Sequence, residues 1–187
     1  MNELHLQFLA SPQWAAMLQT ELLPWLRSVG DLGDDVLEIG PGPGLTTDLL
    51  KDLTPRVTAI ELDEQLAAAL SARLEGTNVT VINADATNTG LDGDRFSAAT
   101  CFSMLHHVPE PEMQDRVFAE VHRVLRPGGL FAVVDSLDIQ AIRGGHVDDV
   151  FVPIHHETLG ARLEAVGFSN LVIEIGAYEF RAHALKR

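Results

Sequence analysis

The sequence predicts an α/β fold, in which one doubly wound, mostly parallel sheet carries helices on both faces and ends in one antiparallel strand. Three observations predict it. Short apolar runs alternate with amphipathic helical patterns between residues 36 and 135. A glycine-rich turn joins the first run to its helix. Near the end, only Gly176 and Ala177 separate two β-patterned stretches, a link short enough for a hairpin and too short for a parallel crossover.

The elements follow in order along the chain. Ser11 and Pro12 are typical of an N-cap and a first helical position, and apolar residues then recur at helical spacing as far as Leu26. Pro24 should kink or interrupt this helix. The apolar run from Val36 leads into the glycine turn and the helical pattern after it. Further strands are expected at 56–60, 79–82, 96–102, 130–135, 171–175 and 178–185, and helices around 66–74, 113–125 and 157–166. Residues 136–156 show no clear period.

One motif is expected to separate the helix at 113–125 from the strand at 130–135. Pro127, Gly128 and Gly129 should stop the helix and open the strand.

Composition limits the partners of the chain. Its 187 residues carry 27 acidic and 13 basic side chains, a net charge of −14 with no cluster of Lys and Arg, so nucleic acid and anionic membranes are not expected partners. The single cysteine, Cys101, excludes an intrachain disulfide and a cysteine-based zinc site, and its strand pattern predicts a buried thiol. No apolar run has membrane-spanning length and no basic-then-apolar leader is apparent, so a cytoplasmic location is expected.

The glycine turn is the most informative segment. Its glycines are Gly40, Gly42 and Gly44. Pro41 and Pro43 each remove an N–H group that a pyrophosphate would use, and Leu45 stands where the dinucleotide fingerprint requires its third glycine. Glu38 would repel a phosphate and suits a cation such as an ammonium or a sulfonium. The turn therefore indicates a ligand other than a dinucleotide.

This segment resembles motif I of the class I S-adenosylmethionine (SAM)-dependent methyltransferases, acidic-x-Gly-x-Gly-x-Gly. Three further segments in the same order strengthen the resemblance: Glu61 at the end of the second strand, Asp85 after the third, and Leu-His-His-Val at 105–108. Pro-Gly-Gly-Leu at 127–130 is similar to another family feature, whereas Ser97 stands where the family often has an acid near the start of the fourth strand. The resemblance covers roughly residues 36–135 and implies the Rossmann-like methyltransferase fold.

The resemblance also implies roles for individual residues. Glu61 would accept hydrogen bonds from the ribose hydroxyls of SAM, Asp85 would bind the adenine amino group, and the N–H of Ala86 would meet a ring nitrogen. The alternatives for the two acids are a helix-opening surface acid and a turn residue. The full set of expected cofactor contacts is Glu38, Gly40, Gly42, Gly44, Glu61, Leu62, Asp85, Ala86 and Ser103.

The implied reaction is transfer of the methyl group of SAM to an O or N atom of a small-molecule acceptor by in-line displacement, which leaves S-adenosylhomocysteine (SAH). His106 and His107 follow the fourth strand where the family places the methyl group, and an imidazole suits a general base. Alternatively, they pack the pocket wall. His146 and Asp148 are expected to contact the acceptor, or else to lie in a solvated loop.

Several classes of acceptor and site are not expected. The Asn/Asp-Pro-Pro-Tyr/Phe motif of nucleic-acid amino methyltransferases is missing, and one cysteine is too few for arsenite methylation. A metal site built from His106, His107, Asp135, His146 and His155 is conceivable, but no pair has the i, i+4 spacing of a helical zinc motif, so no metal is expected.

The domain organisation expected is a single SAM-binding methyltransferase domain over residues 1–187. Residues 1–30 would form a helical lid and 136–156 a substrate loop. Two alternative functions stay open: a non-catalytic SAM-binding protein and a nicotinamide-dependent oxidoreductase. Whether the chain is a monomer or a homodimer is also left open.

Overall fold

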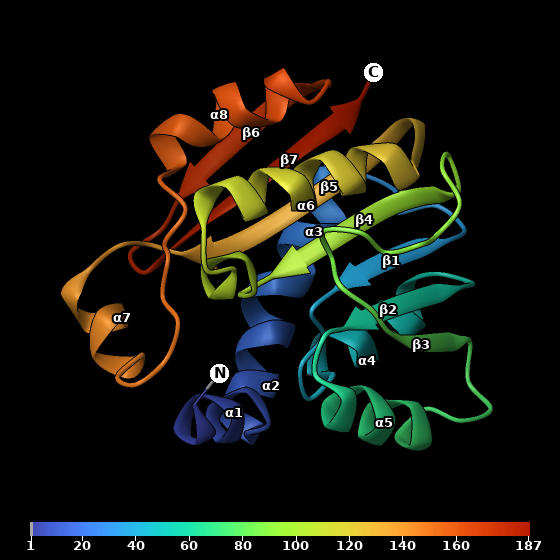
Figure 1. Cartoon of the computed structure of the whole chain (residues 1–187). Coiled ribbons are helices and arrows are strands. Elements are labelled where there is room, and N and C mark those ends of the chain that lie inside the picture. Colours follow the sequence, from blue (N-terminus) through green and yellow to red (C-terminus); the bar gives the residue numbers. More distant parts are fainter. Residues whose placement is uncertain (1) are drawn as a thin grey trace.

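Seven strands form one sheet in the order β3-β2-β1-β4-β5-β7-β6 in the computed structural model, which describes residues 2–187 (Figure 1). β7 is antiparallel to both of its neighbours, while the other strand pairs are parallel. The predicted mostly parallel sheet with one antiparallel strand is confirmed. The strands are β1 (Val36–Ile39), β2 (Val57–Glu61), β3 (Val79–Asn83), β4 (Phe96–Phe102), β5 (Leu125–Ser136), β6 (Phe168–Ile175) and β7 (Glu179–Lys186).

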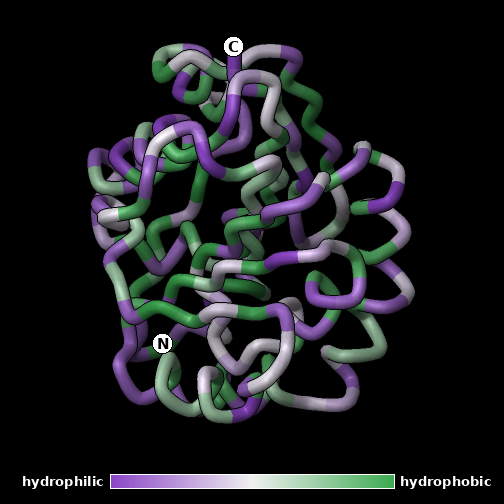
Figure 2. The backbone as a smooth tube through the Cα atoms, turned by 90° about the vertical axis from the view of Figure 1, so that its right-hand side faces the viewer, coloured by the Kyte–Doolittle hydropathy of each residue, from purple (hydrophilic) through white to green (hydrophobic). Residues whose placement is uncertain are grey.

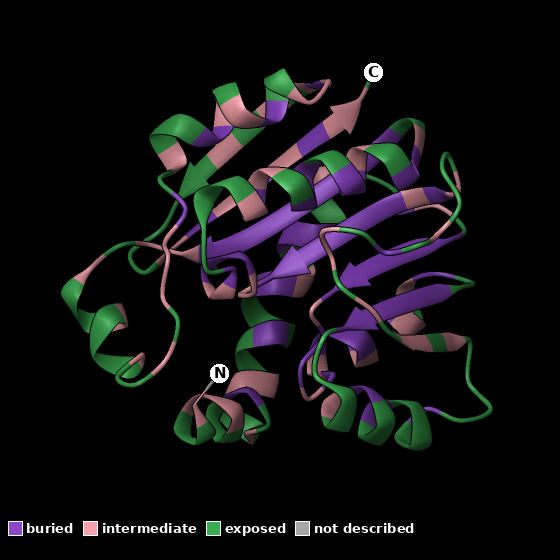
Figure 3. Ribbon diagram, viewed as in Figure 1, coloured by how far each residue is buried: buried purple, intermediate pink, exposed green. Residues whose placement is uncertain are grey.

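Helices cover both faces of the sheet. The expected helices after the glycine turn appear as α4 (Leu45–Leu53), α5 (Glu64–Arg73), α6 (Pro111–Val124) and α8 (His156–Ala165). Two apolar clusters result, one between the sheet and helices α6 and α8, the other between the sheet and the N-terminal helices with α4. The central strands are almost wholly buried (Figure 3), and long hydrophobic stretches cross the middle of the molecule (Figure 2).

Along each central strand, successive side chains pack alternately in the two clusters. In β1, Leu37 packs in the cluster under α6 and α8, while Val36 packs in the other. In β4, Cys101 joins the first cluster and is fully buried, as its strand pattern predicts. Because successive side chains of a strand point to opposite faces, a parallel sheet covered on both sides requires strands that are apolar at every position.

The N-terminal helical pattern is interrupted, as Pro24 predicts. Ser11 caps α2 (Pro12–Met17) by accepting a hydrogen bond from the Trp14 N–H at 3.1 Å. A π-helical turn, η1 (Leu18–Leu22), then leads into α3 (Leu23–Val29), whose first turn contains Pro24. Since proline has no N–H for the preceding turn, the helix widens at this point instead of continuing regularly.

The strand expected to open after Pro127-Gly128-Gly129 begins earlier. β5 starts at Leu125, directly after α6, and Leu125 pairs with Phe96. The next pair is Ala98 with Leu130, so residues 126–129 form a bulge inside the strand. The apolar side chain of Leu125 is fully buried, and pairing it with β4 outweighs the tendency of the glycines to interrupt a strand.

Two short helices that the periodicity did not predict lie at the carboxyl ends of the strands. They are α1 (Glu3–Leu9) and α7 (Gln140–Gly145) (Figure 1). The Asn2 side-chain amide donates to the carbonyl oxygens of Gly145 at 3.0 Å and Val147 at 3.2 Å, and the Asn2 N–H donates to Asp149 at 2.8 Å. The start of the chain is thereby joined to the segment after α7. Within residues 2–187, no helix has both the length and the apolar character that crossing a membrane requires.

Candidate active site

A cavity of about 410 Å³ opens at the carboxyl ends of β1, β2 and β4. Its size lies within the roughly 300–1,000 Å³ typical of small-molecule sites. The glycine turn, the end of β2, the loop at 84–87 and the exit of β4 form one side, and α1, α2 and the start of α6 contribute to the other. The carboxyl edge of a doubly wound sheet is where such folds bind ligands.

The glycine turn brings the backbone close to its neighbours and to the cavity. Gly40 has φ 66°, and a Cβ there would lie 2.2 Å from the Cγ of Met104. Gly42 has φ 52°, and a Cβ there would meet nothing within 4 Å, on a stretch that lines the cavity. Only glycine adopts this succession of left-handed conformations at low cost. The turn therefore presents bare backbone to a ligand.

Glu61 ties the end of β2 to the glycine turn. Its carboxylate accepts hydrogen bonds from the N–H groups of Gly42 and Asp63, each at 3.0 Å, and the residue is only 9% exposed. Glu61 lines the cavity together with its neighbour Leu62, and contact of either residue with the cofactor stays a prediction. Each carboxylate oxygen has a further lone pair, so the group remains able to accept hydrogen bonds from a ligand.

Glu38 lies behind the turn and not among the residues that line the cavity. One carboxylate oxygen accepts a hydrogen bond from the Thr46 hydroxyl, and the other has no partner among residues 2–187. Burial raises the pKa of Glu38 to about 7. A direct contact between Glu38 and the cofactor therefore stays a prediction.

Three further expected cofactor residues line the cavity, whereas Gly44 does not. Asp85 and Ala86 form part of the loop after β3, and Ser103 follows β4 with φ 52°. The Asp85 carboxylate accepts hydrogen bonds from the N–H and hydroxyl of Thr87, both at 2.8 Å, which fixes the loop as an Asx turn. Both alternatives for Asp85, turn residue and ligand contact, are compatible with this position.

The two histidines after β4 have different surroundings. They lie in the 3₁₀ turn η2 (Leu105–His107). His107 lines the cavity, whereas His106 is fully buried and does not. The Nδ1 of His106 contacts the Asp135 carboxylate, and the Nδ1 of His107 lies 3.0 Å from the carbonyl oxygen of Val150.

Four histidines gather beside the cavity. His146 and His5 join His106 and His107, and one ring nitrogen of each lies within 4.8 Å of the others. Burial, followed by the charge of His106, lowers the pKa of His107 to about 3, and burial with the charges of His146 and His106 lowers that of His5 to about 4. Both rings are therefore neutral at pH 7.

The structure does not bring every predicted residue to this place. Asp148 neither lines the cavity nor belongs to the histidine cluster, whereas its neighbour Asp149 lies 3.7 Å from His107. His155 is exposed and precedes α8, outside the cluster.

Several residues of the N-terminal segment escaped prediction as site residues. They are His5, Leu6, Leu9 and Trp14. Asn2, whose side chain caps α1, was the available signal for a helix at this point.

Comparison with known proteins decides the family. The family model described as a methyltransferase domain matches residues 37–133. The chain belongs to the SAM-dependent methyltransferases. It is 35% identical over 166 residues to a ubiquinone biosynthesis O-methyltransferase of Pseudomonas fluorescens, a match that covers 78% of this chain and 69% of the relative. It is also 32% identical over 140 residues to sterol methyltransferase-like 3 of Botryococcus braunii, covering 70% of this chain and 35% of that protein.

The solved structures agree with this family in their fold. A SAM-dependent methyltransferase from Aquifex aeolicus superposes with a TM-score of 0.78 at 20% identity, and the match covers 100% of both chains. The predicted fold is confirmed, and SAM is the cofactor of the family. A nicotinamide-dependent oxidoreductase is no longer a competing interpretation. This SAM-dependent methyltransferase spans only about a third of the length of its Botryococcus relative.

Proposed function

We propose that this methyltransferase transfers the methyl group of SAM to a hydroxyl oxygen of a small, largely apolar acceptor. The observation that carries the proposal is the cavity, which joins a bare glycine turn and the carboxylate of Glu61 to an apolar wall. In the transfer, the acceptor oxygen forms a bond to the methyl carbon as the carbon–sulfur bond breaks. The sulfonium becomes the neutral thioether of SAH, and the acceptor proton passes to water or to a base.

The polar side of the cavity suits the adenosine part of SAM. The N–H of Gly42 fixes the carboxylate of Glu61, and the loop carrying Asp85 and Ala86 lies next to it. We propose that Glu61 binds the ribose hydroxyls and Asp85 the adenine amino group. Both carboxylates are acceptors, which matches the donors that adenosine presents.

The other side of the cavity suits the acceptor. Leu6, Leu9 and Trp14 reach it from the N-terminal helices, and Met113 from the start of α6. An apolar wall of this kind favours an acceptor with a ring or hydrocarbon body. Oxygen as the accepting atom is supported by the name of the Pseudomonas relative, an O-methyltransferase.

We propose that His107 forms part of the cavity wall and does not act as a base toward the acceptor. The ring lines the cavity, but a base works best when its pKa lies near the working pH, and the pKa of His107 is about 3. His106 does not reach the cavity. The reaction then depends on the acidity of the acceptor hydroxyl and on the reactivity of the cationic methyl donor.

The test compares matched acceptors. The purified chain is incubated with isotopically labelled SAM and with pairs of aromatic compounds that differ only in bearing a hydroxyl or an amine. We expect SAH and labelled methyl ethers, measured by mass spectrometry. Methylation of the amines alone would overturn the choice of oxygen. Tight SAH binding without turnover on any pair would favour a non-catalytic SAM-binding protein.

A single substitution tests the cofactor site. Glu61→Gln keeps the shape of the side chain but removes its charge, and a hydrogen bond to a charged group contributes about 1.5–3 kcal/mol. We expect calorimetry to show SAH affinity lower by about ten- to a hundredfold. Glu64→Gln, at an exposed acid that opens α5, should leave affinity unchanged. Equal affinity in both variants would remove Glu61 from the site.

A further inference from the structure

The four histidines of the cluster come from three separate segments of the chain. His5 lies in α1, His106 and His107 in η2, and His146 directly after α7. Their ring centroids are separated by 4.3 to 6.2 Å, so every ring contacts or nearly contacts the others. No sequence spacing relates the three segments, and tertiary structure alone brings them together.

The hydrogen bonds of three rings determine which nitrogen is protonated. The Nδ1 of His107 faces the carbonyl oxygen of Val150, and the Nδ1 of His146 lies 2.8 Å from that of Ile142. A carbonyl oxygen only accepts, so each Nδ1 donates its proton and each Nε2 keeps a lone pair. The Asp135 carboxylate holds Nδ1 of His106 in the same way.

The lone pairs left over are buried and unpartnered. Among the residues that the structure describes, Nε2 of His106, His107 and His146 has no hydrogen-bond partner, and neither has Nδ1 of His5. Buried polar atoms are almost always paired in proteins. Each of the four rings offers a nitrogen within 4.8 Å of the others, and each ring has one buried nitrogen without a partner among the described residues. Such a cluster is a donor set for a cation.

We propose that His5, His106, His107 and His146 bind one divalent transition-metal ion of the zinc class, which fastens α1 and the segment after α7 over the cavity. Imidazole ligands select zinc, copper, nickel or iron over magnesium and calcium. Nitrogen ligands about 2.05 Å from a tetrahedral zinc lie about 3.3 Å apart, so small ring rotations close the set. In such sites the ring nitrogen that does not bind the metal usually donates its N–H to a carboxylate or a carbonyl oxygen.

The charge of the surroundings suits a divalent cation. A histidine binds a metal ion as a neutral imidazole. Two carboxylates stand directly behind the four rings, Asp135 at His106 and Asp149 at 3.7 Å from His107. Together they balance a charge of +2. Four protein ligands complete a tetrahedron, which is the arrangement of a structural and not of a catalytic zinc site. Because Leu6 and Leu9 of α1 line the cavity, the ion would hold one wall of the active site in place.

The test measures metal binding without any turnover, so it is independent of the proposed methyl transfer. The full chain without a polyhistidine tag is stripped with a chelator and titrated with Zn²⁺ by calorimetry. We expect one zinc ion per chain with nanomolar affinity. His5→Ala and His146→Ala should each weaken binding by at least about a hundredfold. His155→Ala, at an exposed histidine outside the cluster, is the matched control and should bind zinc as the unaltered chain does.

A second measurement needs no variant. Co²⁺ bound in a tetrahedral nitrogen site should give intense visible absorption, and zinc should slow hydrogen exchange in residues 3–9 of the unaltered chain. Circular dichroism checks the fold of each variant. Lack of stoichiometric zinc binding to the stripped chain would overturn the proposal. So would binding that survives both His5→Ala and His146→Ala, or that falls equally in His155→Ala.

Discussion

Glu38 lies next to the candidate active site and lowers the stability of the fold at neutral pH. Its carboxylate is fully buried behind the glycine turn and accepts a hydrogen bond from Thr46. Burial raises its pKa from an ordinary 4.5 to about 7. Below pH 4.5 the group is protonated in both the folded and the unfolded chain, and between 4.5 and 7 only the folded chain keeps the proton. The free energy of unfolding should therefore fall as pH rises through this window.

We expect Glu38→Gln to remove this pH dependence. A shift from 4.5 to about 7 corresponds to roughly 3 kcal/mol of folding free energy above pH 7. Relative to the unaltered chain, the variant should gain up to about that amount between about pH 5 and pH 8, measured by urea unfolding. Glu64→Gln, at an exposed position, controls for the loss of one charge. A parallel pH dependence in Glu38→Gln and the unaltered chain would contradict the prediction.

Elements near the site differ in how firmly they are held. α4 and α6 are the α-helices that come next after β1 and β4, and they pack on the sheet, whereas α1 is only seven residues long and has one buried residue, Leu9. A helix this short gains its stability from packing and not from its own hydrogen bonds. Leu6 and Leu9 nevertheless form part of the cavity wall, so the wall depends on the attachment of α1.

Leu9→Asp should release α1 while the sheet stays folded. A charge in place of a leucine that is only 9% exposed costs more than the contacts of so short a helix supply. Hydrogen exchange in residues 3–9 should accelerate, and SAH should bind about tenfold more weakly. Leu4→Asp is the matched control, because Leu4 lies in the same helix and is 77% exposed. Unchanged exchange in Leu9→Asp would show that α1 is held by other contacts.

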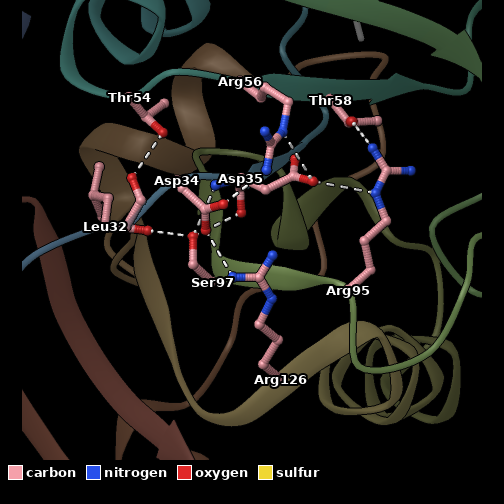
Figure 4. A network of polar contacts seen from close by, with 10 residues as sticks. Leu32, Asp34, Asp35, Thr54, Arg56, Thr58, Arg95, Ser97 and Arg126 are labelled. Atoms are coloured by element: carbon pink, nitrogen blue, oxygen red, sulfur yellow. Dashed lines mark hydrogen bonds and ion pairs between the residues drawn. The ribbon is translucent and has the colours of Figure 1, made fainter.

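In the whole molecule, the cavity and a stabilising polar network lie at opposite ends of the sheet. The cavity lies at the carboxyl ends of the strands, and a polar network holds the opposite end together (Figure 4). Ser97 lies 2.7 Å from the carbonyl oxygen of Leu32 and 3.0 Å from the N–H of Asp35. Arg56 and Arg126 both pair with Asp34 at 2.7 Å. This network joins the starts of β1, β2, β4 and β5.

Ser97→Ala should lower stability without touching the cofactor site. Losing these hydrogen bonds leaves buried backbone groups of the turn before β1 unpaired, at a cost of about 1–3 kcal/mol. Urea unfolding should show this loss, while calorimetry should show SAH affinity equal to that of the unaltered chain. Ser71→Ala, at an exposed position in α5, should change neither quantity. A weaker SAH affinity of a fully folded Ser97→Ala variant would show that the two ends of the sheet are coupled.

The local pattern by itself determined most of the fold and which residues meet at the glycine-turn edge of the cavity. Apolar runs indicate strands that are buried on both faces, and a 3.6-residue period indicates helices. The strand–turn–helix order places Gly40, Glu61 and Asp85 at one edge of the sheet. These are short-range rules, in which each residue is constrained by its neighbours along the chain. The bulge at 126–129 escaped them, because it depends on the pairing of Leu125 with β4.

Only the tertiary structure decided the other side of the site. The sequence predicts no metal site, because no two histidines lie one helical turn apart, whereas the proposed metal ligands come from three segments of the chain. His5 sits in a helix with one buried residue, and its nearest cluster partner in the chain is about a hundred residues away. Contacts between distant segments depend on how whole helices and strands pack against one another, and the periodicity of a sequence does not reveal that packing.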